Sequence, residues 1–275
     1  MTEVRAYSLG VSDSERARLD AQAALIATPT SLFLKSAGIA PGMRVLDLGT
    51  GLGHVAFQLA ELVGPAGSVV GIDQAAATLA VAEERRVAAG IENVRFVEAD
   101  TQTFRDGEPF DAVVGRLLLF HVAEPVEVLR HHLSGLAEDG LMLMIEFDLG
   151  SARAEPPVPL FGAAKDWVTE AFSRAGAHPM IGAQLGLMLR DAGLTDVETF
   201  GIQSYLHPDD PTGPAILAAL VKSLAPIIVS SGIATEEELA LDSLEQRFAR
   251  EAKTSRAVGL PPAVAGAWGR RGAPA

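Results

Sequence analysis

Short apolar runs alternate with amphipathic stretches through the first 150 residues. The runs expected as buried strands are 44–48, 68–73, 94–98, 110–114 and 141–147, and the stretches with helical spacing are 14–37, 54–63, 75–89 and 124–136. Glycine follows several of them, which favours chain turns at those points. Short apolar runs joined by helices are typical of parallel strands with both faces covered. The pattern therefore predicts an α/β fold: a Rossmann-like, mostly parallel sheet with helices on both faces.

This alternation changes after residue 150. Residues 156–176 and 214–252 are expected to be mainly helical, the second stretch with a break near Gly232 and a capping box from Thr235 to Glu238. Residues 182–192 are expected to form a helix, and 197–205 and 263–268 further strands. The sheet then has seven strands, and the helical insertions form a lid. We expect a helical cap over 1–40, a cofactor-binding core over 41–150, a lid with a core helix over 151–195, and closing strands over 196–275 with a helical insertion at 212–253.

Composition narrows the class of protein. Of the 275 residues 48% are hydrophobic and the formal net charge is −13, which favours a full core and disfavours a surface for nucleic acid or anionic membrane. Cysteine is absent, so disulfides and thiolate chemistry are excluded. The first 20 residues lack an apolar leader, and the apolar runs look too short and too interrupted to span a bilayer. A cytoplasmic protein is expected.

The strongest chemical signal is the glycine-rich turn Asp47-Leu48-Gly49-Thr50-Gly51-Leu52-Gly53 after the first strand. Glycine permits a tight turn and a close approach of a ligand to the backbone. The third glycine of a dinucleotide fingerprint would stand at position 54, which is His54. The spacing therefore favours a nucleoside ligand without a pyrophosphate. The alternative is a tight turn that binds nothing.

Two further acids follow neighbouring strands. Asp73 ends the second strand, where a carboxylate can accept both hydroxyl hydrogens of a ribose, and Asp100, followed by Thr101, comes after the third, where it can bind an adenine amino group. Each acid can instead cap a helix or turn, which for Asp73 would be the helix at 75–89. Because the carboxyl ends of parallel strands share one edge, Asp47, Asp73 and Asp100 are expected along one rim of the sheet.

The segments VLDLGTGLG, VVGID, FVEAD and FDAVVGRLLLFHV, in this order, resemble the class I S-adenosylmethionine-dependent methyltransferases of the ubiquinone/menaquinone-biosynthesis type. Further segments are similar to an actinobacterial-style branch of that family: Tyr7-Ser8-Leu9-Gly10, Glu15, Arg18-Leu19, Gln22, 179–182 and 267–271. The resemblance spans nearly the whole chain. It is specific for the fold and the cofactor, and it does not identify the acceptor.

This resemblance implies S-adenosylmethionine as the cofactor and S-adenosylhomocysteine as its product. The residues that it assigns to cofactor binding are Asp47, Gly49, Gly51 and Gly53 for the methionine part, Asp73 for the ribose, Asp100 and Thr101 for the adenine, Arg116 near the reacting methyl, and Tyr7 and Gln22 closing from the N-terminal region. Thr50 and Gln74 are also assigned to cofactor binding. The chain departs from the family at His54, which opens a helix and is expected to point outward.

Methyl transfer from a sulfonium is an in-line displacement, in which the enzyme mainly aligns the acceptor. A base is needed only if the acceptor must lose a proton. The candidates for this role follow strands four and five, come from the insertion or lie on the sixth strand: His121 as the first choice, then Glu146, Asp148, His178 and Tyr205. Glu146 lies in an apolar run and must find hydrogen-bond donors, for which Arg116 or the cofactor is expected.

Other polar side chains are expected to have no catalytic part. His131 and His132 should face solvent on a helix, and no paired carboxylates suggest a magnesium site, so no metal is expected. The resulting hypothesis is a methyltransferase for a small-molecule acceptor in secondary or specialised metabolism, without nucleic-acid or membrane partners and with homo-oligomerisation left open. Two alternatives remain: a methyltransferase-fold cyclase or other non-methylating enzyme that retains the cofactor, and a non-catalytic S-adenosylmethionine-binding module.

Overall fold

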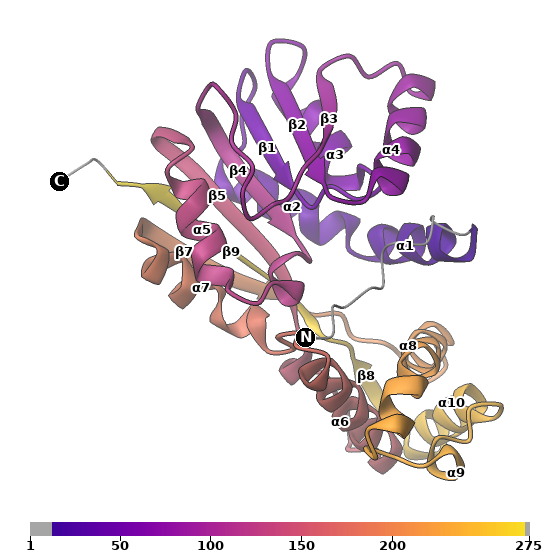
Figure 1. Ribbon diagram of the computed structural model, residues 1–275. Helices are drawn as coiled ribbons and strands as arrows, with labels where there is room; N and C mark the ends of the chain where they lie inside the picture. The colour runs from indigo at the N-terminus through magenta and orange to yellow at the C-terminus, as the bar shows by residue number, and fades with distance from the viewer. Residues whose placement is uncertain (1–12, 273–275) are drawn as a thin grey trace. The chain divides into compact units, whose positions relative to one another are not determined.

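A seven-stranded sheet in the order β3-β2-β1-β4-β5-β9-β7 dominates the computed structural model, which describes residues 13–272, with side chains from residue 16 (Figure 1). Its strands are β1 (Arg44–Leu48), β2 (Ser68–Asp73), β3 (Val94–Glu98), β4 (Phe110–Arg116), β5 (Leu136–Asp148), β7 (Leu194–Ile202) and β9 (Ala263–Arg271). The pairs β1–β2, β2–β3, β1–β4 and β4–β5 are parallel. The predicted Rossmann-like sheet is confirmed.

The chain folds into two compact units. The first takes in the described residues up to Glu146, residues 184–200, and those from Ala265 onward. The second comprises Phe147–Ala183 and Gly201–Val264. The first unit therefore holds the body of the sheet, and the second holds most of the residues that the sequence suggested as a lid.

Apolar strands and glycine-terminated helices build the first unit. Its helices are α1 (Asp13–Leu25), α2 (Ala27–Ala37), α3 (His54–Val63), α4 (Ala76–Ala88), α5 (Pro125–Leu133) and most of α7 (Ile181–Ala192). In β1, Val45, Leu46 and Leu48 are fully buried, as expected for a strand covered on both faces. Figure 1 shows α5 and α7 on the face of the sheet nearer the viewer and α2 and α3 on the far face.

The strand order places one edge of the sheet at a ligand-binding position. The chain runs from β1 outward to β2 and β3, and then returns to β4 on the other side of β1. Such a reversal leaves a crevice beyond the carboxyl ends of the two central strands, where open α/β sheets bind ligands. The glycine turn follows β1, and Asp73 closes β2. The rim predicted from the sequence therefore coincides with the topological switch point.

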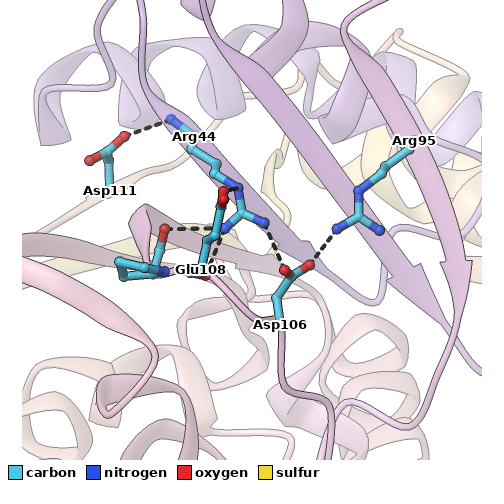
Figure 2. Close-up of polar contacts among 6 residues, drawn as sticks. Arg44, Arg95, Asp106, Glu108 and Asp111 are labelled. Atoms are coloured by element: carbon cyan, nitrogen blue, oxygen red, sulfur yellow. Dashed lines mark hydrogen bonds and ion pairs between the residues drawn. The ribbon is translucent and has the colours of Figure 1, made fainter.

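A cluster of ion pairs fastens the opposite edge of the sheet (Figure 2). Arg44, at the start of β1, donates from its backbone N to Asp111 Oδ2 at 2.7 Å and from Nη1 to the Glu108 carbonyl at 2.8 Å. Its Nη2 lies 3.0 Å from Asp106 Oδ1, and Arg95 of β3 binds the other oxygen of Asp106. Burial acts to raise the pKa of Asp106, but the two guanidinium groups lower it. This cluster joins β1, β3 and the loop before β4.

The second unit is mainly helical. It contains α6 (Pro159–Arg174), α8 (Thr212–Ser230), α9 (Glu236–Leu239), α10 (Leu244–Ser255), the turn η2 (Leu149–Ser151) and a two-stranded sheet of β6 (Arg153–Glu155) and β8 (Val258–Leu260). Helix α8 packs against α6 and α10. The rings of Phe161 and Phe248 lie 5.1 Å apart and join α6 to α10.

Several boundaries differ from the sequence expectation. The break expected near Gly232 is present, because α8 ends at Ser230 and α9 begins at Glu236, but a second break at Ala240, whose φ is 42°, was not expected. The capping box from Thr235 to Glu238 is present at the start of α9. Strand β5 begins at Leu136 instead of 141, and the helix expected at 14–37 breaks at Ile26. The three-residue strands β6 and β8 were not predicted, because they are too short for a period-two pattern.

Helix α8 also corrects the expectation that no apolar run could span a bilayer. Within the described part of the chain, it is the one helix of sufficient length and hydropathy to cross a membrane. Val221 and Ile228 on this helix are fully buried. The helix contributes these side chains to the core of the second unit.

Candidate cofactor site

The glycine turn after β1 exposes its backbone at the switch point. Gly51 has a φ of 52°, and a Cβ added there would meet nothing within 4 Å, so its backbone borders open space. Gly53 differs: its φ is 83°, and a Cβ would come within 2.8 Å of Phe57 and 3.1 Å of Phe96. Gly51 thus leaves room for a ligand, whereas Gly53 allows α3 to pack closely against the sheet.

Asp73 connects the ends of β1 and β2. Its Oδ2 accepts a hydrogen bond from the Gly51 backbone N at 2.9 Å, and its Oδ1 accepts one from the Ala75 N at 2.9 Å. The N-cap of α4 is Ala75 and has no side-chain bond, so Asp73 is not the helix cap considered as its alternative role. Each carboxylate oxygen has a second lone pair, which leaves Asp73 able to accept hydroxyl hydrogens. Gln74 beside it is exposed.

Asp47 lies below the glycine turn as a buried acid. Asp47 is 1% exposed, and its Oδ2 accepts a hydrogen bond from Thr50 Oγ1 at 2.6 Å. Burial raises the pKa of Asp47 to about 7, against the opposing effects of Thr50 and the charge of Arg116. Burial also lowers the pKa of Arg116, whose Nη1 donates to Thr30 Oγ1 of α2 at 3.1 Å. Asp47 and the partly buried guanidinium of Arg116 therefore lie near each other below the glycine turn, and each acts on the pKa of the other.

The loop after β3 is held in place by a histidine. Asp100 is exposed, and its Oδ1 accepts from the Gln102 N at 2.8 Å. Thr101 is buried, and its carbonyl lies 2.6 Å from His132 Nε2 of α5. Burial lowers the pKa of His132 to about 4, so the neutral ring donates this hydrogen bond. The predicted adenine-binding pair thus has a partner that the sequence analysis did not find.

The expectation that His131 and His132 face solvent is wrong. His132 is only 3% exposed, and His131 Nε2 lies 2.9 Å from the Phe104 carbonyl. Both rings face the loop after β3, because α5 packs beside it and the loop presents carbonyls that need donors. The helical pattern of α5 did not reveal this, since it shows which face is apolar and not which carbonyls lie opposite.

The turn after β4 contains one catalytic candidate, His121, and is bound by a second, Glu146 of β5. It contains the 3₁₀ helix η1 (Leu119–His121), whose first amides are bound by Glu146. Glu146 Oε1 accepts from the Leu118 N at 2.9 Å and from the Leu119 N at 2.7 Å, and burial raises the pKa of this side chain to about 8. Its donors are therefore backbone amides, and not Arg116 as expected. His121 is exposed, its ring lies 4.9 Å from that of Phe120, and partial desolvation lowers the pKa of its imidazole.

The three other catalytic candidates, Asp148, His178 and Tyr205, belong to the second unit, where Tyr205 is exposed. Asp148 Oδ1 accepts from the Gly150 N at 3.0 Å and caps the short turn η2. His178 lies just before α7, and its carbonyl accepts from the Ile181 N at 3.0 Å. The Asp148 side chain thus stabilises the turn after β5, and the His178 backbone takes part in the turn before α7.

The N-terminal helix is tied to the core by a cluster that the sequence did not reveal. Asp20 of α1 accepts from Arg85 of α4 at 2.9 Å through both oxygens, and its Oδ1 lies 2.8 Å from His54 Nε2. The expectation that His54 points outward is therefore wrong, and burial lowers its pKa. Gln22 on the same helix accepts from Arg18 Nη1 at 3.1 Å. Tyr7, the other predicted residue of this region, lies outside the described residues.

The methyltransferase domain family matches residues 39–180, which include the glycine turn, the three rim acids and the turn after β4. The chain belongs to this family. Two relatives are the ubiquinone/menaquinone biosynthesis C-methyltransferases UbiE of Ectopseudomonas mendocina (33% identical, covering 67% of this chain and 66% of the relative) and Azotobacter vinelandii (31% identical, 67% and 68%). Matches to several other relatives cover about half of their length.

Solved structures show the same fold at lower identity. The 4+2 cyclase SpnF is 20% identical with a TM-score of 0.53, covering 90% of this chain and 81% of its own. Phosphoethanolamine N-methyltransferase 2 of Haemonchus contortus, solved with phosphomonomethylethanolamine and S-adenosylhomocysteine, is 17% identical with a TM-score of 0.57, covering 90% and 53%. The resemblance to class I S-adenosylmethionine-dependent methyltransferases is confirmed, and with it the enzyme class and its cofactor.

The residues at the rim fit this cofactor. The backbone of Gly51 borders open space, as a closely approaching ligand requires, and Asp73 offers acceptors beside it. Among the residues that the structure describes, no group of three or more His, Asp or Glu side chains is placed to hold a metal ion.

Proposed function

We propose that this chain transfers the methyl group of S-adenosylmethionine to a small-molecule acceptor of specialised metabolism in the cytoplasm. The observation that carries the proposal is the bond from Gly51 N to Asp73 Oδ2 at the switch point, beside a glycine with open space over its backbone. This pairing holds a ribose acceptor next to a turn that admits a ligand. The net charge of −13 supports a small acceptor over nucleic acid or an anionic membrane.

The cofactor-binding roles follow from the position of each residue along the rim. Asp47, Gly49, Thr50, Gly51 and Gly53 form the turn for the methionine part, Asp73 and Gln74 serve the ribose, Asp100 and Thr101 the adenine, Arg116 the region of the reacting methyl, and Gln22 the N-terminal side. The buried Asp47 supports the turn through Thr50. We assign Gly53 to packing under Phe57 and Phe96, so its contribution to binding is indirect.

Alignment of the acceptor is the main catalytic task. When bound, S-adenosylmethionine supplies an electrophilic methyl group. The turn after β4 presents His121, whose lowered pKa keeps the imidazole neutral near pH 7. A neutral imidazole can accept a proton from an acceptor hydroxyl, amine or carbon acid. We therefore assign the proton-accepting role to His121, and we assign Asp148 and His178 to the structure of the second unit.

Acceptor selection is proposed to depend on residues beyond the family match. The match ends at residue 180, so α8, α9 and α10 lie outside it. Helix α8 exposes the apolar side chain of Ile216, which suits an acceptor with an apolar body. The two UbiE relatives are named for C-methylation, which makes a carbon atom the first acceptor to test.

Calorimetric titration with S-adenosylmethionine and S-adenosylhomocysteine tests the cofactor site. Asp73→Ala should weaken both affinities by about tenfold or more, roughly 1.4 kcal/mol. Glu98→Ala is a matched control, because Glu98 pairs with Asp73 in the β2–β3 register, is exposed, and carries the same charge. An equal loss in both variants would point to a general charge effect and contradict the assignment of Asp73. Binding without methyl transfer to any acceptor would instead favour a non-methylating enzyme.

A further inference from the structure

The turn between β4 and η1 is strained at its first residue. Leu117 has a φ of 55°, a backbone conformation that residues with a side chain rarely adopt. Its backbone N donates to the Ile145 carbonyl of β5 at 2.9 Å. Such a conformation persists only where surrounding contacts enforce it. The contacts made by the residues after Leu117 therefore determine whether this turn keeps a single conformation.

The strained turn contacts the glycine turn directly. A Cβ added at Gly49 would lie 3.1 Å from Leu118 Cδ1, so the Leu118 side chain rests against the glycine backbone. Two residues further along, Phe120 is buried and leads to His121. A shift of the turn would therefore move both the support of the cofactor turn and the candidate base.

Glu146 is the group that holds the turn. Glu146 is 0% exposed, and its Oε1 accepts hydrogen bonds from the backbone N of Leu118 at 2.9 Å and of Leu119 at 2.7 Å. The other oxygen, Oε2, is buried and has no hydrogen-bond partner in the described part of the chain. A buried carboxyl group with one oxygen outside any hydrogen bond lowers the stability of the folded state. An apolar residue would fill this place at lower cost if packing were its whole purpose.

We propose that Glu146 is a positioning residue for methyl transfer: by binding the amides of Leu118 and Leu119 it fixes the turn that supports Gly49 and presents His121. The inference rests on the proposed function. It replaces the catalytic role that the sequence suggested for Glu146, because a fully buried carboxyl group cannot touch acceptor or cofactor. It also explains why the chain retains an acid inside the apolar run of β5.

Two substitutions separate positioning from packing. Glu146→Gln keeps an oxygen acceptor for the two amides, whereas Glu146→Leu keeps the volume and removes the acceptor. Leu143→Ala is the control for general destabilisation, because Leu143 is fully buried on the same strand and is not bonded to the turn. Hydrogen exchange over residues 117–121 reports the turn, and calorimetry with S-adenosylhomocysteine reports the cofactor site.

The expected pattern is specific to the turn. Glu146→Leu should speed exchange of the amides of Leu118 and Leu119 by about tenfold or more. It should also weaken S-adenosylhomocysteine binding by about three- to tenfold. Glu146→Gln should restore both to within about twofold of the unsubstituted protein. Leu143→Ala should lower thermal stability without either change. Equal behaviour of Glu146→Leu and Leu143→Ala, or failure of Glu146→Gln to restore binding and exchange, would overturn the proposal.

The unsubstituted protein offers a test that does not depend on folding of the variants. The amides of Leu118 and Leu119 should exchange at rates close to those of β4, because a buried acceptor holds them. Exchange at the rate of an open turn would overturn the role of Glu146. If the unsubstituted protein binds S-adenosylhomocysteine but the Glu146→Leu variant binds it equally well, only this inference fails. If the unsubstituted protein does not bind it, the proposed function fails as well.

Discussion

Replacement of His132 by glutamine should change how stability depends on pH. His132 is 3% exposed and bonds to the Thr101 carbonyl at 2.6 Å. Burial lowers its pKa from 6.5 to about 4. Glutamine can place a neutral amide donor near the position of Nε2, so the variant keeps a donor for Thr101 and loses the titration.

The sign and size of the effect follow from proton linkage. Between pH 6.5 and 4 the unfolded chain binds a proton at His132 that the folded chain does not, so the folded state loses stability as the pH falls through this window. For a folded pKa of about 4, the loss at pH 4 is about 3 kcal/mol relative to pH 8. The His132→Gln variant lacks this contribution. As the pH falls from 8 to 4, its free energy of unfolding should therefore rise by about 3 kcal/mol relative to that of the unsubstituted protein.

Urea unfolding at several pH values measures this difference. The chain has two tryptophans, and Trp268 belongs to the first unit with His132, whereas Trp167 belongs to the second. A Trp167→Phe background leaves Trp268 fluorescence to report on the first unit alone. His131→Gln is the matched control, and the acid-linked loss of stability should persist in it. A constant difference between His132→Gln and its parent from pH 8 to pH 4 would refute the argument that His132 is buried and neutral.

Three further predictions concern the two edges of the sheet. Asp106→Ala should lower the free energy of unfolding by about 1–3 kcal/mol, because it leaves Arg44 and Arg95 without their shared partner. Urea unfolding should show this loss, whereas calorimetry should show an unchanged affinity for S-adenosylhomocysteine. A weakened affinity would contradict the separation of the two edges. Gly51→Ala should weaken the affinity for S-adenosylhomocysteine by about tenfold or more, since alanine is strained at a φ of 52° and its methyl group would occupy the ligand's space. Calorimetry that shows normal binding would contradict the place of Gly51 in the site. The Glu146→Gln variant should gain stability relative to the unsubstituted protein as the pH rises from 4.5 to about 8, by at most about 5 kcal/mol. The reason is that Glu146 ionises in the unfolded chain within this window, whereas the buried carboxyl group of the folded chain does not. Urea unfolding at pH 5 and pH 9 should show the gain, and an equal difference in stability at both pH values would contradict it.

The sequence predicts the strands and the rim acids well, because both are local signals. The runs at 44–48 and 68–73 are apolar and end in a glycine turn and an acid, and both are strands with the same bounds in the structure. Asp73 then lies beside Gly51 because parallel strands bring their carboxyl ends together. Here the local pattern and the topology rule are sufficient.

The contacts that fix the site come from residues far apart in the chain, and the sequence does not show them. Asp20 and Arg85 are separated by 65 positions, yet they bind each other and His54. Glu146 could be recognised as a buried acid that needs donors, but not that backbone amides 27 and 28 positions away would supply them. Such partners depend on the path of a turn, which side-chain periodicity does not encode.

Ligand-induced protection from hydrogen exchange locates S-adenosylhomocysteine on the chain and so tests whether the cofactor binds at the carboxyl ends of the strands. Upon binding, exchange should slow in residues 49–53, 73–75 and 100–102, and it should stay unchanged around Arg44 and residues 105–111 at the opposite edge of the sheet. Protection confined to other segments, or binding without protection of the glycine turn, would contradict the assignment of the cofactor to the switch point between β1 and β4.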